Sequence, residues 1–221
     1  MEDWEETLNQ IRVMRSHTRA PVDTMGCYAL AEKVAEPKVF RYQVLVGLLL
    51  SSQTRDEVTF GAVRRLQQLP LVPGVIAKES EEKLAELIKP VGFYRRKAAS
   101  LKNLSQILVD QYKEDIPTEL KDLLGLPGIG PKMAYLALQN AWGRSEGIGV
   151  DVHVHRICGR LGWTKGTTPE SARKELESWL PREHWAEINP LLVGFGQTVC
   201  LPIKPRCHDC MLKDSCPSSI I

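Results

Sequence analysis

The chain has 221 residues, of which 43% are hydrophobic and 25% charged, as is ordinary for a soluble globular protein. No run of eighteen apolar residues occurs, which excludes a transmembrane helix, and we expect no membrane partner. The formal net charge of +2 does not by itself indicate a nucleic-acid partner. Residues 1–10 carry acids and no base, so the rest of the chain holds an excess of positive charge that is compatible with a phosphate partner.

The spacing of apolar residues predicts helices nearly throughout the chain, and the alternating runs typical of strands are scarce. The run from Val39 to Leu50 is apolar on most faces, which predicts a buried central helix. Because proline and glycine separate the segments, we expect a compact all-α protein with short loops. In chain order, the predicted helices cover residues 26–36, 39–52, 56–68, 80–89, 95–111, 132–142, 151–161, 169–179 and 183–193.

The most informative segment covers residues 123–134 and reads LLGLPGIGPKMA. It predicts a short helix, a tight turn and a second helix that begins at Pro131, since proline suits a first helical position. Gly128 and Gly130 let the backbone turn sharply and approach a ligand closely. The free N–H groups at the second helix start then form an anion site, for which a DNA phosphate is the natural ligand. A bare Gly-x-Gly would instead indicate a plain helix–turn–helix corner.

Lys132 lies in the first turn of that second helix. The positive helix end disfavours an ammonium there, and burial acts in the same direction, as a lysine nucleophile requires. The alternative is a solvated lysine that simply holds phosphate. Asp151, further along the chain, follows a glycine-rich loop and is placed to cap the next predicted helix.

That next helix carries His153 and His155, which face different ways because they are two residues apart, so we expect them to share no metal ion. Contacts at the surface or with the DNA backbone are the more natural role for both. Arg156 and Arg160 are four residues apart and share one face. They form either a small phosphate-facing stripe or a solvated surface.

A group of cysteines near the C-terminus has the spacing C-x6-C-x2-C-x5-C and consists of Cys200, Cys207, Cys210 and Cys216. The first residues, MEDW, lack a signal pattern, so we expect an intracellular protein, in which disulfides are rare. Thiolates at this density then indicate a bound metal or cluster. Zinc sites more often pair two C-x2-C knuckles, and this tail contains only one. Lys204 and Arg206 make the loop basic.

The hairpin with its lysine, the aspartate and the cysteine tail occur here in one order. Together they closely resemble the endonuclease III family from about Gly26 to Cys216, and the PKMA and VHR segments resemble its eukaryotic branch. The resemblance implies a monomeric, bifunctional DNA glycosylase and AP lyase that excises oxidised pyrimidines from duplex DNA, in the nucleus and mitochondrion. It also implies two helical domains with a DNA cleft between them. One is a six-helix barrel at residues 34–144, and the other joins residues 1–33 to the iron–sulfur region at 145–221.

Site residues follow from the same resemblance. Lys132 matches the Schiff-base nucleophile, and Asp151 matches the catalytic carboxylate that stabilises positive charge on the sugar as the base departs. Gln53, in LLLSSQTRD, matches the residue that fills the hole left by the flipped base. Phe93, in VGFY, matches an apolar wedge that is often leucine, whereas Val152 stands where the family usually has threonine. The cysteine spacing matches the family's [4Fe–4S] loop. The remaining expected DNA contacts are Leu126, Gly128, Gly130, Lys204 and Arg206.

Two alternatives stay open. An adenine-mismatch glycosylase of the same superfamily shares the cluster, but it lacks the Schiff-base lysine and carries a large extra C-terminal domain. Lys132, and a chain that ends soon after Cys216, argue against it. A non-catalytic helix–hairpin–helix DNA-binding module with a structural cluster is the second alternative, and the joint presence of Lys132 and Asp151 argues against that. Activity on a duplex that contains thymine glycol separates these possibilities.

Overall fold

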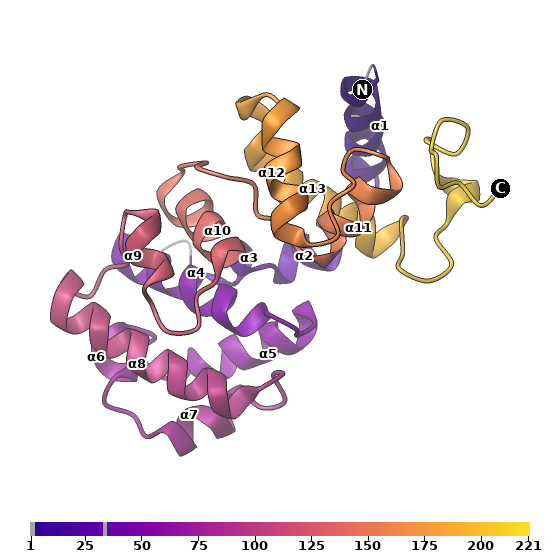
Figure 1. Ribbon diagram of the computed structural model, residues 1–221. Helices are drawn as coiled ribbons and strands as arrows, with labels where there is room; N and C mark the ends of the chain where they lie inside the picture. The colour runs from indigo at the N-terminus through magenta and orange to yellow at the C-terminus, as the bar shows by residue number, and fades with distance from the viewer. Residues whose placement is uncertain (1–2, 33–34) are drawn as a thin grey trace. The chain divides into compact units, whose positions relative to one another are not determined.

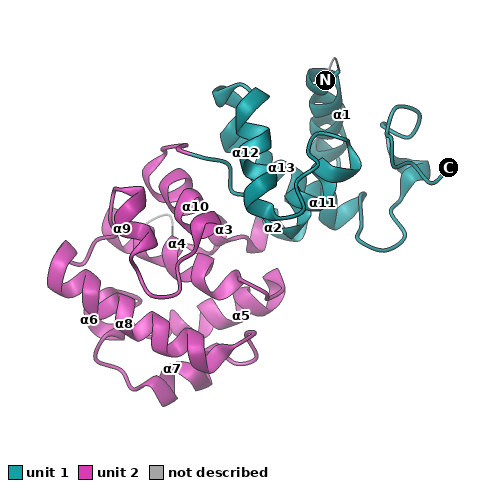
Figure 2. Cartoon of the chain, viewed as in Figure 1, with its two compact units in different colours: residues 1–23, 147–221 teal, residues 24–146 magenta. Residues whose placement is uncertain are grey.

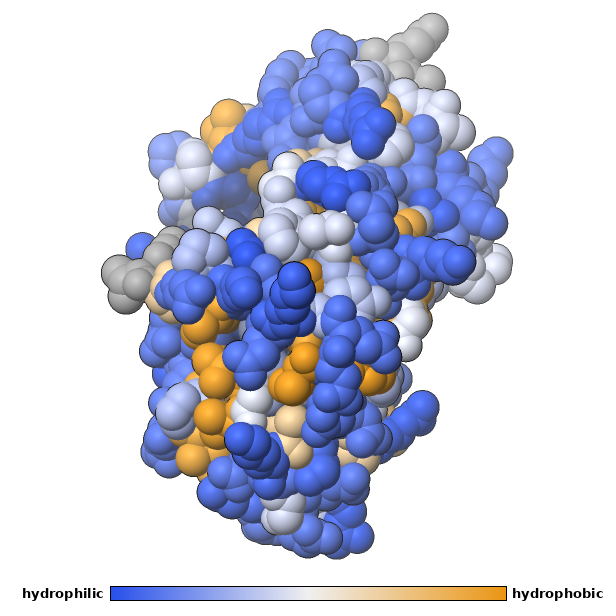
Figure 3. Space-filling model, turned by 90° about the vertical axis from the view of Figure 1, so that its left-hand side faces the viewer, coloured by the Kyte–Doolittle hydropathy of each residue, from blue (hydrophilic) through white to orange (hydrophobic). Residues whose placement is uncertain are grey.

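The computed structural model describes residues 3–32 and 35–221, and every regular element within these ranges is a helix (Figure 1). The prediction of an all-α protein is therefore confirmed. In the same ranges, no helix has both the length and the apolar character needed to cross a bilayer. Polar side chains dominate the face shown in Figure 3, where apolar atoms emerge only in small areas between them.

The chain divides into two compact units (Figure 2). Unit 1 combines residues 1–23 with 147–221, and unit 2 comprises residues 24–146. Each unit has its own hydrophobic core. Our expected domain boundary between residues 33 and 34 lies outside the described residues. The other boundary is expected after residue 144, and in the structure the chain passes from unit 2 to unit 1 after residue 146.

Unit 2 is built around one buried helix, α4, in which every residue from Tyr42 to Leu50 is buried. This confirms the predicted central helix, because a helix that is apolar on most faces must be covered on most sides. It packs against α3, α5, α8 and α10. The helices of unit 2 are α3 (Cys27–Leu30), α4 (Pro37–Ser51), α5 (Asp56–Leu66), α6 (Pro73–Ile76), α7 (Glu81–Ile88), α8 (Tyr94–Tyr112), α9 (Leu120–Leu124) and α10 (Pro131–Trp142).

Unit 1 is held together mainly by α13, which packs against α1 and α11. Leu8 and Ile11 on α1 are fully buried in its core, and the ring of Trp179 contacts those of Trp4 and Trp163. Its elements are α1 (Trp4–Ser16), α11 (Val152–Arg160), α12 (Pro169–Trp179), η1 (Arg182–His184), α13 (Trp185–Thr198) and η2 (Cys207–Asp209). Helix α2 (Pro21–Met25) spans the change from unit 1 to unit 2.

The sequence-based prediction of helices needs correction at three points. The helix predicted at 183–193 is found as α13 and continues to Thr198, with Pro190 inside it. Helices α2 and α6 were missed, and so was α1, while the helix predicted at 26–36 ends early. The predicted helix at 26–36 is wrong beyond Leu30, because Ala31 is extended and ends α3; residues 33 and 34 of that prediction lie outside the described residues. Glu36 is extended too, as the residue before a proline usually is. Helix α1 was not predicted at all, although its buried pair Leu8 and Ile11 has helical spacing.

Candidate functional site

The turn between α9 and α10 needs its two glycines for different reasons. Gly128 has a left-handed backbone, with φ of 81°, and a Cβ added there would lie 2.8 Å from Leu49 Cδ1. Gly130 is extended, with φ of −101°, and an added Cβ would meet no atom within 4 Å. Gly128 therefore makes the turn possible, while Gly130 leaves open space beside the backbone. Leu126 is only 4% exposed, so any ligand contact at that position falls to its main chain.

Helix α10 begins with free donors. Pro131 occupies the first turn, and among the described residues no acceptor is found for the N–H groups of Gly128, Gly130, Lys132 and Met133. Such N–H groups, together with the positive end of the helix dipole, make an anion site. The local structure thus has the donors that a phosphate requires.

Lys132 lies half-buried in this first turn, near the thiol of Cys27. Burial raises the pKa of the Cys27 thiol, while a hydrogen bond with Ser51 and the charge of Lys132 act against that rise. Cys27 itself packs on Gly47 of α4, where an added Cβ would approach it to 3.4 Å. The amine of Lys132 is therefore at the edge of unit 2's core rather than fully solvated.

Gln53 and Phe93 share an uncommon backbone conformation. Gln53 has φ of 50° and Phe93 has φ of 57°, and both are in the left-handed region that non-glycine residues rarely adopt. Gln53 follows the end of α4 and is exposed, while Phe93 precedes α8 and is 64% exposed. An exposed aromatic side chain on a strained backbone points to a role outside the folded core.

Asp151 caps α11, as the sequence predicts. Its Oδ1 accepts hydrogen bonds from the N–H groups of His153 at 2.9 Å and Val154 at 2.8 Å. The other carboxylate oxygen is left out of the cap, so capping does not use all of the group's capacity. Val152, next to it, is 70% exposed.

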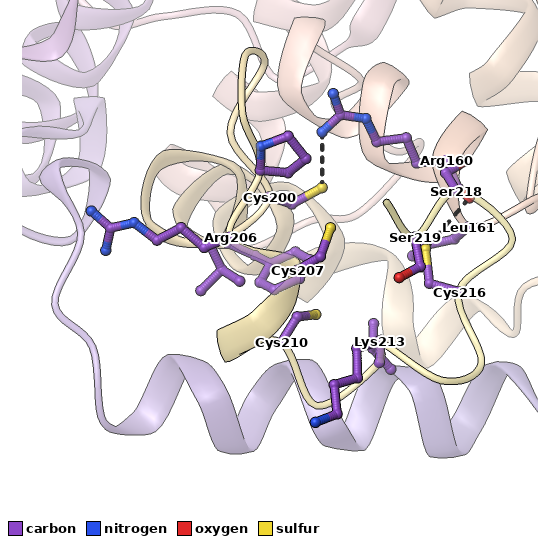
Figure 4. Close-up of a pocket in the computed structure, with 14 residues that line it drawn as sticks. Arg160, Leu161, Cys200, Arg206, Cys207, Cys210, Lys213, Cys216, Ser218 and Ser219 are labelled. Atoms are coloured by element: carbon purple, nitrogen blue, oxygen red, sulfur yellow. Dashed lines mark hydrogen bonds between the residues drawn. The ribbon is translucent and has the colours of Figure 1, made fainter. Parts of the chain in front are cut away.

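All four tail cysteines line one pocket of unit 1 (Figure 4). Cys200, Cys207 and Cys210 lie along one side, and Cys216 enters from the other, where the chain passes Ser218 and Ser219. Burial raises the pKa of the Cys210 thiol, and the charges of the other three cysteines raise it further. No three metal-binding side chains of the described residues converge tightly enough to hold a single metal ion.

Arg160 and Arg156 tie this pocket to α11. Arg160 donates to Cys200 Sγ at 3.2 Å (Figure 4). It also donates to the Leu201 carbonyl at 2.7 Å and to the Pro202 carbonyl at 3.0 Å. Arg156 donates to the Cys200 carbonyl at 2.8 Å. The expectation that these two arginines form a phosphate-facing or solvated stripe is therefore wrong, because both guanidinium groups donate hydrogen bonds to main-chain carbonyls of residues 200–202.

The basic side chains of the cysteine loop are exposed. Lys204 has a left-handed backbone with φ of 52°, and Arg206 extends away from the sulfurs (Figure 4). The main-chain N–H of Arg206 donates to the Val199 carbonyl at 2.9 Å, which fixes the loop's return. His155, which we expected at the surface or on DNA, instead contacts the Gly166 carbonyl through Nε2 at 2.8 Å.

Sequence analysis missed Lys97 and Thr54. Lys97 belongs to the basic run 95–97, yet it is only 6% exposed, and burial lowers its pKa to about 8. Its Nζ donates to the carbonyls of Leu50 and Ser52. The available signal was spacing, since Lys97 shares a helical face with buried Leu101, Leu104 and Leu108.

Comparison with known proteins places this arrangement in a family. Residues 46–182 match the family described as HhH-GPD superfamily base excision DNA repair protein. Endonuclease III-like protein 1 of Bos taurus is 52% identical over 99% of this chain and 72% of its own length, and that of Mus musculus is 50% identical over 99% and 73%. A trapped endonuclease III–DNA covalent intermediate has a TM-score of 0.84 at 25% identity, covering 99% of this chain and 96% of the other.

A helix–hairpin–helix protein of base excision DNA repair is thus the class that the fold and the sequence match define. Within that class, the chain belongs to the endonuclease III family. It is a DNA-binding glycosylase of base excision repair, and the comparisons do not favour an adenine-mismatch glycosylase or a non-catalytic module.

Proposed function

We propose that the protein is a bifunctional DNA glycosylase and AP lyase that removes oxidised pyrimidines from duplex DNA, with Lys132 as its nucleophile. The observation that carries this proposal is the placement of Lys132, half-buried in the first turn of α10 and directly after a turn with unpaired N–H groups. A phosphate held by those N–H groups brings a deoxyribose next to the amine. Phosphate contacts position the enzyme on DNA, and they do not read the base sequence.

The reaction begins when the neutral amine of Lys132 attacks C1′ of the flipped nucleotide. The bond to the damaged base breaks, its electron pair leaves with the base, and the base takes up one proton of the amine. The C1′–O4′ bond then opens, O4′ takes up a proton from water, and a protonated Schiff base links the enzyme to the opened sugar. Loss of a proton from C2′ then expels the 3′ phosphate by β-elimination, which nicks the strand. Such attack needs the amine roughly 3–3.5 Å from C1′.

Asp151 is the proposed carboxylate partner. Its role is to stabilise the positive charge that grows on the sugar as the base departs, and to help Lys132 lose a proton. The hydrogen bonds that Oδ1 accepts from α11 support this role, because they fix the orientation of the carboxylate.

Gln53 and Phe93 are the proposed residues that enter the DNA stack. Extruding a base costs about a few kcal/mol, least for a damaged base, and a plug and a wedge stabilise the opened duplex. Their exposure and left-handed backbones support this assignment. The proposed backbone contacts come from the main chain around Leu126, Gly128 and Gly130 and from the exposed Lys204 and Arg206.

The cysteine pocket is the proposed site of a [4Fe–4S] cluster held by Cys200, Cys207, Cys210 and Cys216. A single zinc ion with bonds of about 2.3 Å would draw its four sulfurs to about 3.8 Å from one another. Thiols spread around a pocket, with no three converging on one point in the described chain, suit the larger cube better. The cluster would supply structural support to the basic loop that carries Lys204 and Arg206.

We further propose that the protein acts as a monomer in the nucleus and mitochondrion, as the eukaryotic resemblance implies. Among the relatives, Endonuclease III homolog 1 of Arabidopsis thaliana is named as chloroplastic, and this chain spans 59% of its length.

The test is Lys132→Gln, assayed on a duplex with one thymine glycol. Native protein should release the base, nick the strand and form a covalent complex when borohydride is present. Lys132→Gln should lose all three, because an amide cannot form a Schiff base. Lys83→Gln is the matched control, since Lys83 is an exposed lysine of the same unit that is paired with Glu79. A trapped complex that persists in Lys132→Gln would remove Lys132 from the mechanism.

A further inference from the structure

The two residues proposed to enter DNA sit on separate loops, yet one hydroxyl joins them. Thr54, which follows Gln53, accepts a hydrogen bond from the N–H of Gly92, which precedes Phe93, at 3.1 Å. The loops also approach closely, because a Cβ added at Gly92 would lie 2.7 Å from the Gln53 carbonyl oxygen. The left-handed residues Gln53 and Phe93 therefore lie close together, where the loop at residues 52–54 meets the loop at residues 92–93 within unit 2. We call this contact between the two loops the seam.

Lys97 lies beneath this seam and uses every proton of its ammonium group. Nζ donates to the Leu50 carbonyl at 2.8 Å, to the Ser52 carbonyl at 2.5 Å and to Thr54 Oγ1 at 3.2 Å. An ammonium has three donors, so none is left over. The main-chain N–H of Lys97 also donates to the Phe93 carbonyl at 3.0 Å, which connects the same residue to the second loop.

The hydroxyl group of Thr54 also uses its full hydrogen-bonding capacity. It donates to the Ser52 carbonyl at 3.1 Å and accepts from Gly92 and Lys97, which uses its one donor and both acceptor positions. A fully satisfied buried network is rigid, whereas losing one member leaves the others unpaired. The backbone of Gln53 is thus fixed on both sides, at Ser52 and at Thr54.

The charge on Lys97 has no other evident use. No ion pair in the described ranges includes Lys97, although the side chain is almost completely buried. Burying an unpaired charge is expensive, and its hydrogen bonds here all go to one short stretch of backbone. Strained backbone persists only where its surroundings hold it in place.

We propose that Lys97 and Thr54 are positioning residues that hold Gln53 and Phe93 in their left-handed conformations before DNA binds. This inference rests on the proposed roles of Gln53 and Phe93. Because both side chains are set on a rigid base, the enzyme does not have to order them while it opens the duplex, and preorganisation of this kind strengthens binding.

The experiment compares Lys97→Met in two backgrounds, the native chain and the Gln53→Ala/Phe93→Ala double variant. In the native background, Lys97→Met should lower kcat/KM for thymine glycol release at least about tenfold, which corresponds to about 1.4 kcal/mol. In the double variant it should lower kcat/KM less than about twofold, because the side chains it positions are already absent. A 2-aminopurine opposite the lesion should report reduced base opening in the first background only.

Lys102→Met is the matched control. Lys102 is on the same helix, α8, and its Nζ also donates to a main-chain carbonyl, that of Glu79 at 2.5 Å. This variant removes an equivalent contact away from the seam, so it should leave kcat/KM unchanged in both backgrounds.

Thr54→Val and Thr54→Ser give a second test that does not depend on whether Lys97→Met folds. Thr54→Val should reduce base opening, and Thr54→Ser, which keeps the hydroxyl, should restore it. Equal losses from Lys97→Met in both backgrounds, or native base opening in Thr54→Val, would overturn the proposal. A native protein that forms no borohydride-trapped complex would instead refute the proposed chemistry, so the two failures are distinguishable.

Discussion

Replacing each glycine of the hairpin by alanine should change a different property: Gly128→Ala should lower stability, whereas Gly130→Ala should weaken DNA binding. Gly128→Ala places a Cβ on a backbone with φ of 81° and at 2.8 Å from Leu49 Cδ1, a side chain that is itself 2% exposed. The left-handed conformation costs an alanine about 1–2 kcal/mol, and overpacking adds about 1–3 kcal/mol. The free energy of unfolding should therefore fall by about 2–5 kcal/mol.

Gly130→Ala should leave the fold almost unchanged. Its φ of −101° suits any residue, and the new methyl group meets no protein atom within 4 Å. The loss is limited to about 1 kcal/mol, because alanine is a poor residue at a helix N-cap. The methyl group does occupy the space beside the unpaired N–H groups. Losing one hydrogen bond to a charged phosphate, about 1.5–3 kcal/mol, should weaken DNA binding roughly tenfold or more.

Thermal unfolding by circular dichroism and equilibrium binding to a duplex measure the two effects separately. Gly128→Ala should lower Tm on the order of 10 °C. Gly130→Ala should keep Tm near the native value and lose affinity. If Gly128→Ala melts at the same temperature as the native protein, the turn at Gly128 is neither crowded nor left-handed. If Gly130→Ala binds DNA as the native protein does, phosphate does not approach this helix end.

Two further predictions concern carboxylates of unit 1. Asp151→Asn should keep α11 capped, with stability within about 1 kcal/mol, but lower single-turnover base release about a hundredfold or more; native-rate release would leave Asp151 with capping alone. Although burial alone would raise the pKa of Glu187, hydrogen bonds from Arg12 and His184 outweigh it and lower that pKa below 4.5. The stability contributed by this carboxylate is present above pH 4.5 and is lost as pH falls through the lowered pKa. Urea unfolding of native and Glu187→Gln protein should therefore converge in acid, and a constant difference would contradict this linkage.

Long segments with strong periodicity and clear end signals were predictable from the sequence. Helix α12 begins and ends where expected, because Thr168 forms a capping box and Pro169 fixes the first turn. Helix α1 was not predicted, because its stability comes from packing against α13, and its acidic first turn is typical of any solvated segment. Tertiary contacts of this kind leave little trace in a local pattern.

The site was predictable as a set of positions, but not as a set of contacts. Spacing located the cysteine tail, and the glycines located the hairpin. Spacing could not show that Gly128 is crowded while Gly130 is open, since both occur in the same short string. Nor could it show that Arg160 faces Cys200, because the helix face that a loop will cover depends on how the chain returns.

Lys97 and Lys132 show why the position of a lysine relative to a helix matters more than its residue type. Lys97 meets the carbonyls at the C-terminal end of α4, where the helix dipole is negative and favours a cation. Lys132 lies at the N-terminal end of α10, where the dipole is positive and the nearby N–H groups seek an anion. The ammonium group of Lys97 donates its hydrogen bonds to backbone acceptors and therefore has a structural role. For the amine of Lys132 the described residues provide no such acceptors, which supports the role of nucleophile proposed for it.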